Sequence, residues 1–98
     1  MKSSDQTPQS RIEFLRRFIL LHSYLYYELD RSLVTDHFYD ERCKELVKLQ
    51  NEHGVTGQFA DVFSDFDGST GFDLYHRLDG EGICWVRTIA WRLTKRAD

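Results

Sequence analysis

The strongest constraint on the fold is a helical repeat of large side chains near the start of the chain. Between residues 9 and 29, such side chains recur at intervals of three and four residues, at Ile12, Leu15, Ile19, His22, Tyr26 and Leu29. This spacing places them on one face of an α-helix. Four neighbours, Phe14, Phe18, Leu21 and Leu25, widen the stripe. The pattern predicts a long helix that is buried on more than one side.

Two overlapping signals predict the start of this helix. Thr7 followed by Pro8 has the form of an N-cap with proline at the first helical position, and Ser10 with Glu13 has the form of a capping box. We therefore expect a flexible N-terminus over residues 1–9 and a single folded domain over residues 10–98.

A second helix is predicted from residue 36. Thr35 is expected to cap this helix, and Asp36 in its first turn is favourable at the positive end of the helix dipole. Gly54 is expected to end the helix. Its apolar side comprises Tyr39, Cys43, Leu46, Val47 and Leu49. A connection of about five residues favours antiparallel packing of the two helices.

Further helices are predicted after residue 57. Phe59, Val62, Phe63 and Phe66 fall at helical spacing and predict a short helix, and the segment DGSTG over residues 67–71 predicts a turn. A last helix is expected over residues 81–95, with Ile83, Val86, Ala90 and Leu93 on its apolar face. Trp85 and Trp91 lie roughly 120° to either side of that face, so one of them is expected to be exposed. The fold class is all-α, in one small domain.

Composition excludes several functional classes. The net charge of −3 supplies no general positive field, so strong binding to nucleic acid is not expected. Two cysteines and four scattered histidines show no metal-ligand spacing. No leader peptide and no long apolar run is found, so no membrane association and a cytoplasmic location are expected.

One cluster of residues suggests a binding site. Asp36, Tyr39 and Asp40 share one face of the first turn of the second helix, and Tyr26 and Tyr27 end the first helix near the same corner. Aromatic faces attract a delocalised cation, and carboxylates accept hydrogen bonds from ribose hydroxyls. The cluster therefore suits a flat cationic ring that carries a ribose.

The run SYLYYELDRSLVTDHFYDERCKELVKLQ, residues 23–50, resembles the N-terminal helical module of NAD-dependent DNA ligases. The usual form there is Y-x-Y-Y/H-x-x-D, a short linker, and D-x-x-Y-D-x-L-x-x-E-L. The resemblance implies that Tyr26, Tyr27, Asp36, Tyr39 and Asp40 contact nicotinamide mononucleotide (NMN), free or as part of NAD. Arg31, Ser32 and Arg42 depart from the family pattern.

The resemblance does not extend to ligase catalysis. RLDG at residues 77–80 resembles the K-x-D-G adenylation motif, but Arg77 replaces the nucleophilic lysine, and the chain reaches Asp98 before further nucleotidyl-transfer motifs. DFDGST at residues 65–70 resembles a phosphatase loop, but that loop requires a parallel sheet, which is not expected here. We therefore expect a polar turn. No enzymatic activity is expected.

Two functional hypotheses follow. The first is a non-catalytic module that binds NMN or NAD weakly, without a metal, and whose phosphate contact is Arg11, Arg16, Arg17 or Arg31. The second is a protein-interaction or regulatory module, of the kind encoded by phage accessory genes. In it the ligase-like hairpin is a scaffold, and Trp85 and Trp91 form an interface to a partner or a second copy together with residues 65–75.

Overall fold

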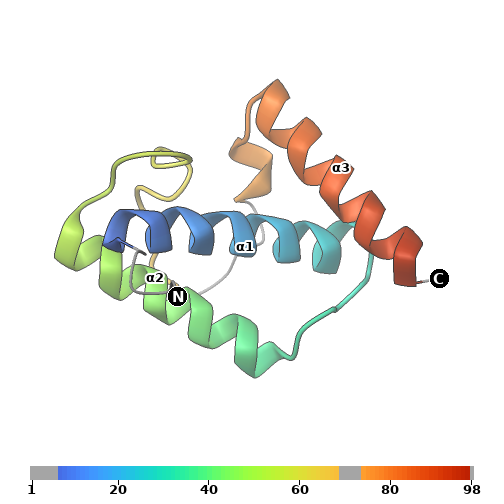
Figure 1. Ribbon diagram of the computed structural model, residues 1–98, viewed down its shortest axis with the longest axis horizontal. Coiled ribbons are helices and arrows are strands. Elements are labelled where there is room, and N and C mark those ends of the chain that lie inside the picture. Colours follow the sequence, from blue (N-terminus) through green and yellow to red (C-terminus); the bar gives the residue numbers. More distant parts are fainter. Residues whose placement is uncertain (1–6, 69–73, 98) are drawn as a thin grey trace.

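The computed structural model describes residues 7–68 and 74–97, and these residues form helices and turns without a strand. The helices are α1 (Pro8–Glu28), α2 (Asp36–His53), a short 3-10 helix η2 (Tyr75–Arg77) and α3 (Gly80–Ala97). Helices α1 and α2 run in opposite directions, and α3 crosses the far end of α1 (Figure 1). The expectation of an all-α domain that begins with an antiparallel hairpin is confirmed.

Helix α1 begins where its sequence signals predict. The Thr7 hydroxyl accepts a hydrogen bond from the Ser10 amide at 3.1 Å, and Pro8 occupies the first turn. Pro8 and Gln9 are therefore helical, whereas residues 1–6 of the expected flexible N-terminus lie outside the described part of the chain. The capping box is not used, because Glu13 instead accepts from the Gln58 amide at 3.0 Å.

The boundaries of α2 follow the same local signals. The Thr35 hydroxyl accepts from the Phe38 amide at 3.1 Å, and Asp36 opens the helix. Gly54 ends it with a φ of 95°, a left-handed conformation that glycine adopts at little cost. These positions match the predicted cap and stop.

The expected short helix over residues 59–66 does not form. The segment is a run of turns, because Gly57 and Phe59 adopt φ angles of 88° and 63°, which are incompatible with a right-handed helix. Its apolar spacing instead reflects burial, since Phe63 is fully buried and Val62 is nearly so. Within the DGSTG segment, residues 69–71 lie outside the described part of the chain.

The core forms where α2, α3 and the turns pack on α1. Val86 and Ala90 of α3 are fully buried, and Trp85 packs against Phe59 with ring centroids 5.9 Å apart. Trp91 is 59% exposed. The prediction that one of the two tryptophans is exposed is therefore confirmed, and the exposed one is Trp91.

A buried arginine ties the turns to α1. Arg16 is fully buried, and its guanidinium donates to the Gln50 side chain at 2.9 Å and to the carbonyl oxygens of Thr56 and Gln58 at 2.7 and 2.8 Å. Burial lowers the pKa of Arg16 from its ordinary value. Arg16 therefore fixes the chain that follows α2 against the middle of α1.

Candidate functional site

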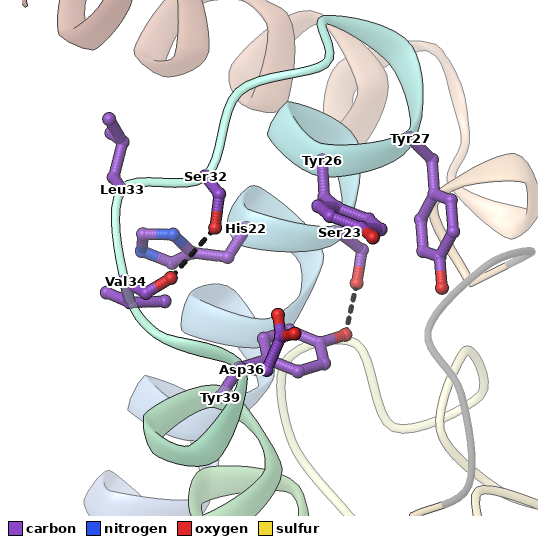
Figure 2. Close-up of a pocket in the computed structure, with 9 residues that line it drawn as sticks. All are labelled: His22, Ser23, Tyr26, Tyr27, Ser32, Leu33, Val34, Asp36 and Tyr39. Atoms are coloured by element: carbon purple, nitrogen blue, oxygen red, sulfur yellow. Dashed lines mark hydrogen bonds between the residues drawn. The ribbon is translucent and has the colours of Figure 1, made fainter.

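A pocket of about 200 Å³ lies between the end of α1, the connecting segment and the first turn of α2 (Figure 2). Side chains from all three segments line it: His22, Ser23, Tyr26, Tyr27, Ser32, Leu33, Val34, Asp36 and Tyr39. Four of the five residues predicted to bind a ligand are among them. The pocket exists because the antiparallel hairpin brings the end of one helix beside the start of the next.

Tyr26 and Tyr27 supply aromatic surface from the last turn of α1. Their side chains are 51% and 43% exposed, and the two rings meet edge to face with centroids 4.9 Å apart. A large exposed aromatic side chain at the rim of a pocket leaves surface available for a ligand.

Tyr39 forms a fixed wall of the pocket. Its hydroxyl lies 2.6 Å from the hydroxyl of the buried Ser23, which is the contact drawn between α2 and α1 in Figure 2. Burial raises the pKa of Tyr39 well above its ordinary value, and burial likewise raises the pKa of the neighbouring Cys43 thiol to about 11. The phenol and the thiol are therefore both neutral at physiological pH.

Asp36 brings a carboxylate to the pocket, whereas Asp40 does not line it. Asp36 is exposed at the start of α2, where a negative charge is favourable. Asp40 lies one turn further along, and its carboxylate is 3.2 Å from Lys44 Nζ. The structure thus brings Asp36 together with the three tyrosines and leaves Asp40 in an exposed ion pair outside the pocket.

His22 forms part of the pocket on the side of the connecting segment. Its ring packs on Phe18 with centroids 4.3 Å apart, and burial lowers the pKa of the imidazole. His22 therefore carries no charge near pH 7. The sequence places His22 in the predicted buried stripe of the first helix, and its half-buried position agrees with that expectation.

Sequence reasoning missed the other polar residues of the site. Ser23 precedes Tyr26 by three positions, so it occupies the same face of α1, and this spacing could have found it. Ser32 donates to the Val34 carbonyl at 2.8 Å and shapes the connecting segment. No sequence signal indicated the path of that segment.

None of the four candidate phosphate-binding arginines is among the described residues that line the pocket. Arg16 is buried, so its assignment to a ligand is wrong. Arg11 forms an ion pair with Glu45 at 2.7 Å, and Arg17 donates to the Gln58 side chain at 2.8 Å. Arg31 is exposed in the connecting segment beside the pocket residue Ser32.

The RLDG and DFDGST segments, which resemble enzyme motifs, contact each other through Arg77 and Asp65. Arg77, at the position of a ligase lysine, donates to the carboxylate of Asp65 at 2.6 Å and to the Val62 carbonyl at 3.1 Å. This contact lowers the pKa of Asp65. Both side chains therefore help to hold the turn region in place.

Residues 7–68 and 74–97 contain no group of three or more potential metal-ligating side chains. In the same part of the chain, no helix has the length and hydropathy needed to span a membrane.

Comparison with known proteins agrees with this geometry. Residues 5–57 match the family described as "DNA ligase-like, N-terminal NAD+-binding domain". Similar proteins include the DNA ligases of Desulforamulus reducens, 42% identical over 53 residues, and of Bacillus subtilis, 44% identical over 48 residues. These alignments cover 54% and 49% of this chain but only 8% and 7% of the two ligases. No solved structure matches significantly.

The family match contains every described residue that lines the pocket, and it covers more than half of the chain. The resemblance that was carried by residues 23–50 is thereby confirmed. The chain belongs to the family of DNA ligase-like, N-terminal NAD+-binding domains.

Proposed function

We propose that this domain is a non-catalytic module that binds nicotinamide mononucleotide, free or as the NMN half of NAD, in the pocket between α1 and α2. The observation that carries the proposal is the convergence of Tyr26, Tyr27, Asp36 and Tyr39 on that pocket. The family to which residues 5–57 belong is described as NAD+-binding, which supports the same ligand class.

The chemistry of the pocket fits a positively charged pyridinium ring. Three tyrosine rings offer π-faces, and a cation held over such a face gains about 0.5–2 kcal/mol. The carboxylate of Asp36 would accept hydrogen bonds from ribose hydroxyls. Because His22 is neutral, it adds no charge that would repel the ligand.

The size of the pocket limits how much of a ligand it can hold. Its volume of about 200 Å³ is below the roughly 300–1,000 Å³ of ordinary small-molecule sites. We therefore expect it to take the nicotinamide ring and its ribose and to leave the phosphate at the rim. So few contacts correspond to a dissociation constant on the order of tens of micromolar to millimolar.

We assign no covalent step to this pocket. The Ser23 hydroxyl is bonded to Tyr39, and Tyr39 and Cys43 have raised pKa values that disfavour their nucleophilic anions. Arg77 stands where the ligase motif has lysine, and a guanidinium is a poor nucleophile. The role supported by these residues is recognition of the nucleotide.

A nuclear magnetic resonance titration with NMN, NAD and AMP in parallel would test the proposal. We expect saturable amide shifts with NMN and NAD, centred on the pocket residues of α1 and α2, and none with AMP. Asp36→Asn should weaken binding about tenfold, since it removes one charge-assisted contact. Glu41→Gln is the matched control, because Glu41 is also on α2 but lies outside the pocket.

Two results would contradict the proposal. One is the absence of saturable shifts with NMN and NAD while the protein remains folded. The other is equal loss of affinity in Asp36→Asn and Glu41→Gln, which would indicate a general charge effect. The family resemblance also implies a contact from Asp40, whose carboxylate pairs with Lys44, so Asp40→Asn should be titrated beside them.

A further inference from the structure

A second concave surface lies beside the last turns of α1, on the side that faces α3. It is a groove of about 690 Å³ between the end of α1 and the exposed side of α3, and we call it the α3 groove. Its principal side chains are Tyr24, Leu29, Ile83, Cys84, Arg87 and Trp91. None of these residues lines the pocket described above.

The α3 groove exposes large apolar side chains. Trp91 is 59% exposed and Leu29 is 39% exposed, and both border the same groove. Trp85, the other tryptophan of α3, is half-buried against Phe59 and does not line it. Clustered exposed apolar side chains, with tryptophan among them, are typical of surfaces that bind another protein.

The rim of the groove is positively charged. Arg87 lines it, and Lys95 Nζ lies 4.6 Å from the centroid of the Trp91 ring. These three residues are spaced four apart and therefore follow one face of α3. No carboxylate is found among the described residues that line the groove, although the whole chain has a net charge of −3. The groove is thus a basic and apolar surface on an acidic protein.

We propose that the α3 groove binds an acidic amphipathic segment of another protein, with apolar side chains against Trp91 and Leu29 and carboxylates facing Arg87 and Lys95. Complementary charge selects the partner, and the apolar floor provides the contact area. This site is separate from the nucleotide pocket, so the inference does not depend on the proposed nucleotide.

The same features disfavour two other occupants. In a symmetric dimer each residue meets the same patch of the other copy, so pairing through Trp91 would place Arg87 and Lys95 against like charges. A nucleic acid would use several phosphate contacts, whereas the groove is mainly apolar and only a few cations border it. An acidic polypeptide satisfies both the apolar floor and the basic rim.

Cys84 offers a direct reporter for occupancy of the groove. It is exposed and lines the groove, whereas Cys43 is buried and has a pKa of about 11. Iodoacetamide should therefore modify Cys84 selectively near neutral pH. A ligand that covers the groove should slow this modification without unfolding the protein.

The probes are two helical peptides that share leucine and phenylalanine at positions i, i+4 and i+7. One has glutamate at the flanking positions, the other has lysine there, and a single-stranded oligothymidylate serves as a third probe. We expect the glutamate peptide to slow Cys84 modification at least about fivefold at saturation and to bind at least about tenfold more tightly than the lysine peptide. Amide shifts should centre on residues 83–95.

A charge-reversed protein makes the test specific. In Arg87→Glu/Lys95→Glu, the preference should switch to the lysine peptide, while circular dichroism stays unchanged because both side chains are exposed. The inference is overturned if neither peptide protects Cys84, if both protect it equally, or if charge reversal leaves the preference unchanged. Stronger protection by oligothymidylate than by the glutamate peptide would overturn it in favour of a nucleic-acid surface.

Discussion

Replacing Arg16 by methionine should be among the most destabilising substitutions in the described part of the chain. The guanidinium makes three hydrogen bonds of 2.7–2.9 Å, to Gln50 and to the carbonyl oxygens of Thr56 and Gln58. Methionine fills much of the same volume but donates none of them. The side chain of Gln50 is buried, so its Oε1 would lose the Arg16 donor without gaining water, while its Nε2 would still donate to the Phe63 carbonyl.

The expected loss is about 3–5 kcal/mol in the free energy of unfolding. A hydrogen bond to a charged group contributes about 1.5–3 kcal/mol, which sets an upper limit of about 9 kcal/mol for three. The net value is lower because Thr56 and Gln58 are exposed, so water can satisfy their carbonyl groups. In addition, Arg16 Nη2 is buried without a partner among the described residues, which is a cost that methionine removes.

Urea denaturation followed by far-ultraviolet circular dichroism would measure this loss. The matched control is Arg17→Met, because Arg17 is the next residue and its guanidinium donates an exposed hydrogen bond to the Gln58 side chain. We expect less than about 1 kcal/mol there. A loss of 3 kcal/mol corresponds to a fall in Tm of at least about 12 °C for a domain of this size. Equal effects of the two substitutions would refute the structural role of Arg16.

Three further predictions follow from the same structure. Ser23→Ala and Tyr39→Phe should each lower the free energy of unfolding by about 1–2 kcal/mol. The double mutant should lose less than the sum of the two, because the two hydroxyls are 2.6 Å apart and share one hydrogen bond. Additive losses would contradict the contact. Stability should fall between pH 7 and pH 5, because burial lowers the pKa of His22 and the unfolded chain therefore binds a proton at this residue first as the pH falls. His22→Gln should flatten the plot of urea midpoint against pH in that range. An unchanged slope would refute this cause. Gly57→Ala should destabilise by at least about 2 kcal/mol, since its φ is 88° and the new Cβ would displace the Gln9 and Glu13 side chains from their hydrogen bonds to Thr56 and Gln58. Gly54→Ala, with a φ of 95° and open space, should cost about 1 kcal/mol by the same assay. Equal losses would exclude the contribution of the displaced side chains.

Local signals in the sequence predicted the helical hairpin well. Thr7, Thr35 and Gly54 act on the backbone within a few residues, so their effect does not depend on the rest of the fold. The turn region was harder, because nothing in the sequence distinguishes Phe59 in a left-handed conformation from Phe59 in a helix. Apolar spacing at helical intervals indicated burial there without indicating the backbone.

The candidate site was predictable to the extent that it lies on helices. Tyr26, Tyr27, Asp36 and Tyr39 line one pocket because helix periodicity and an antiparallel turn place them at one corner. The contribution of the connecting segment was not predictable, since a loop's path depends on packing that no short pattern encodes. Arg16 carried an overlooked signal, because it follows Ile12 by four residues and precedes Ile19 by three, in the middle of the buried stripe.

All the described side chains that line the pocket between α1 and α2 lie between residues 22 and 39, within one hairpin. Closing so short a loop costs little conformational entropy, and among the described residues none from the turns or from α3 lines the pocket. The sequence after residue 57 can therefore diverge over evolution while the pocket is inherited unchanged. A hairpin of this kind is a transferable unit, which different proteins can carry beside unrelated surfaces such as the α3 groove.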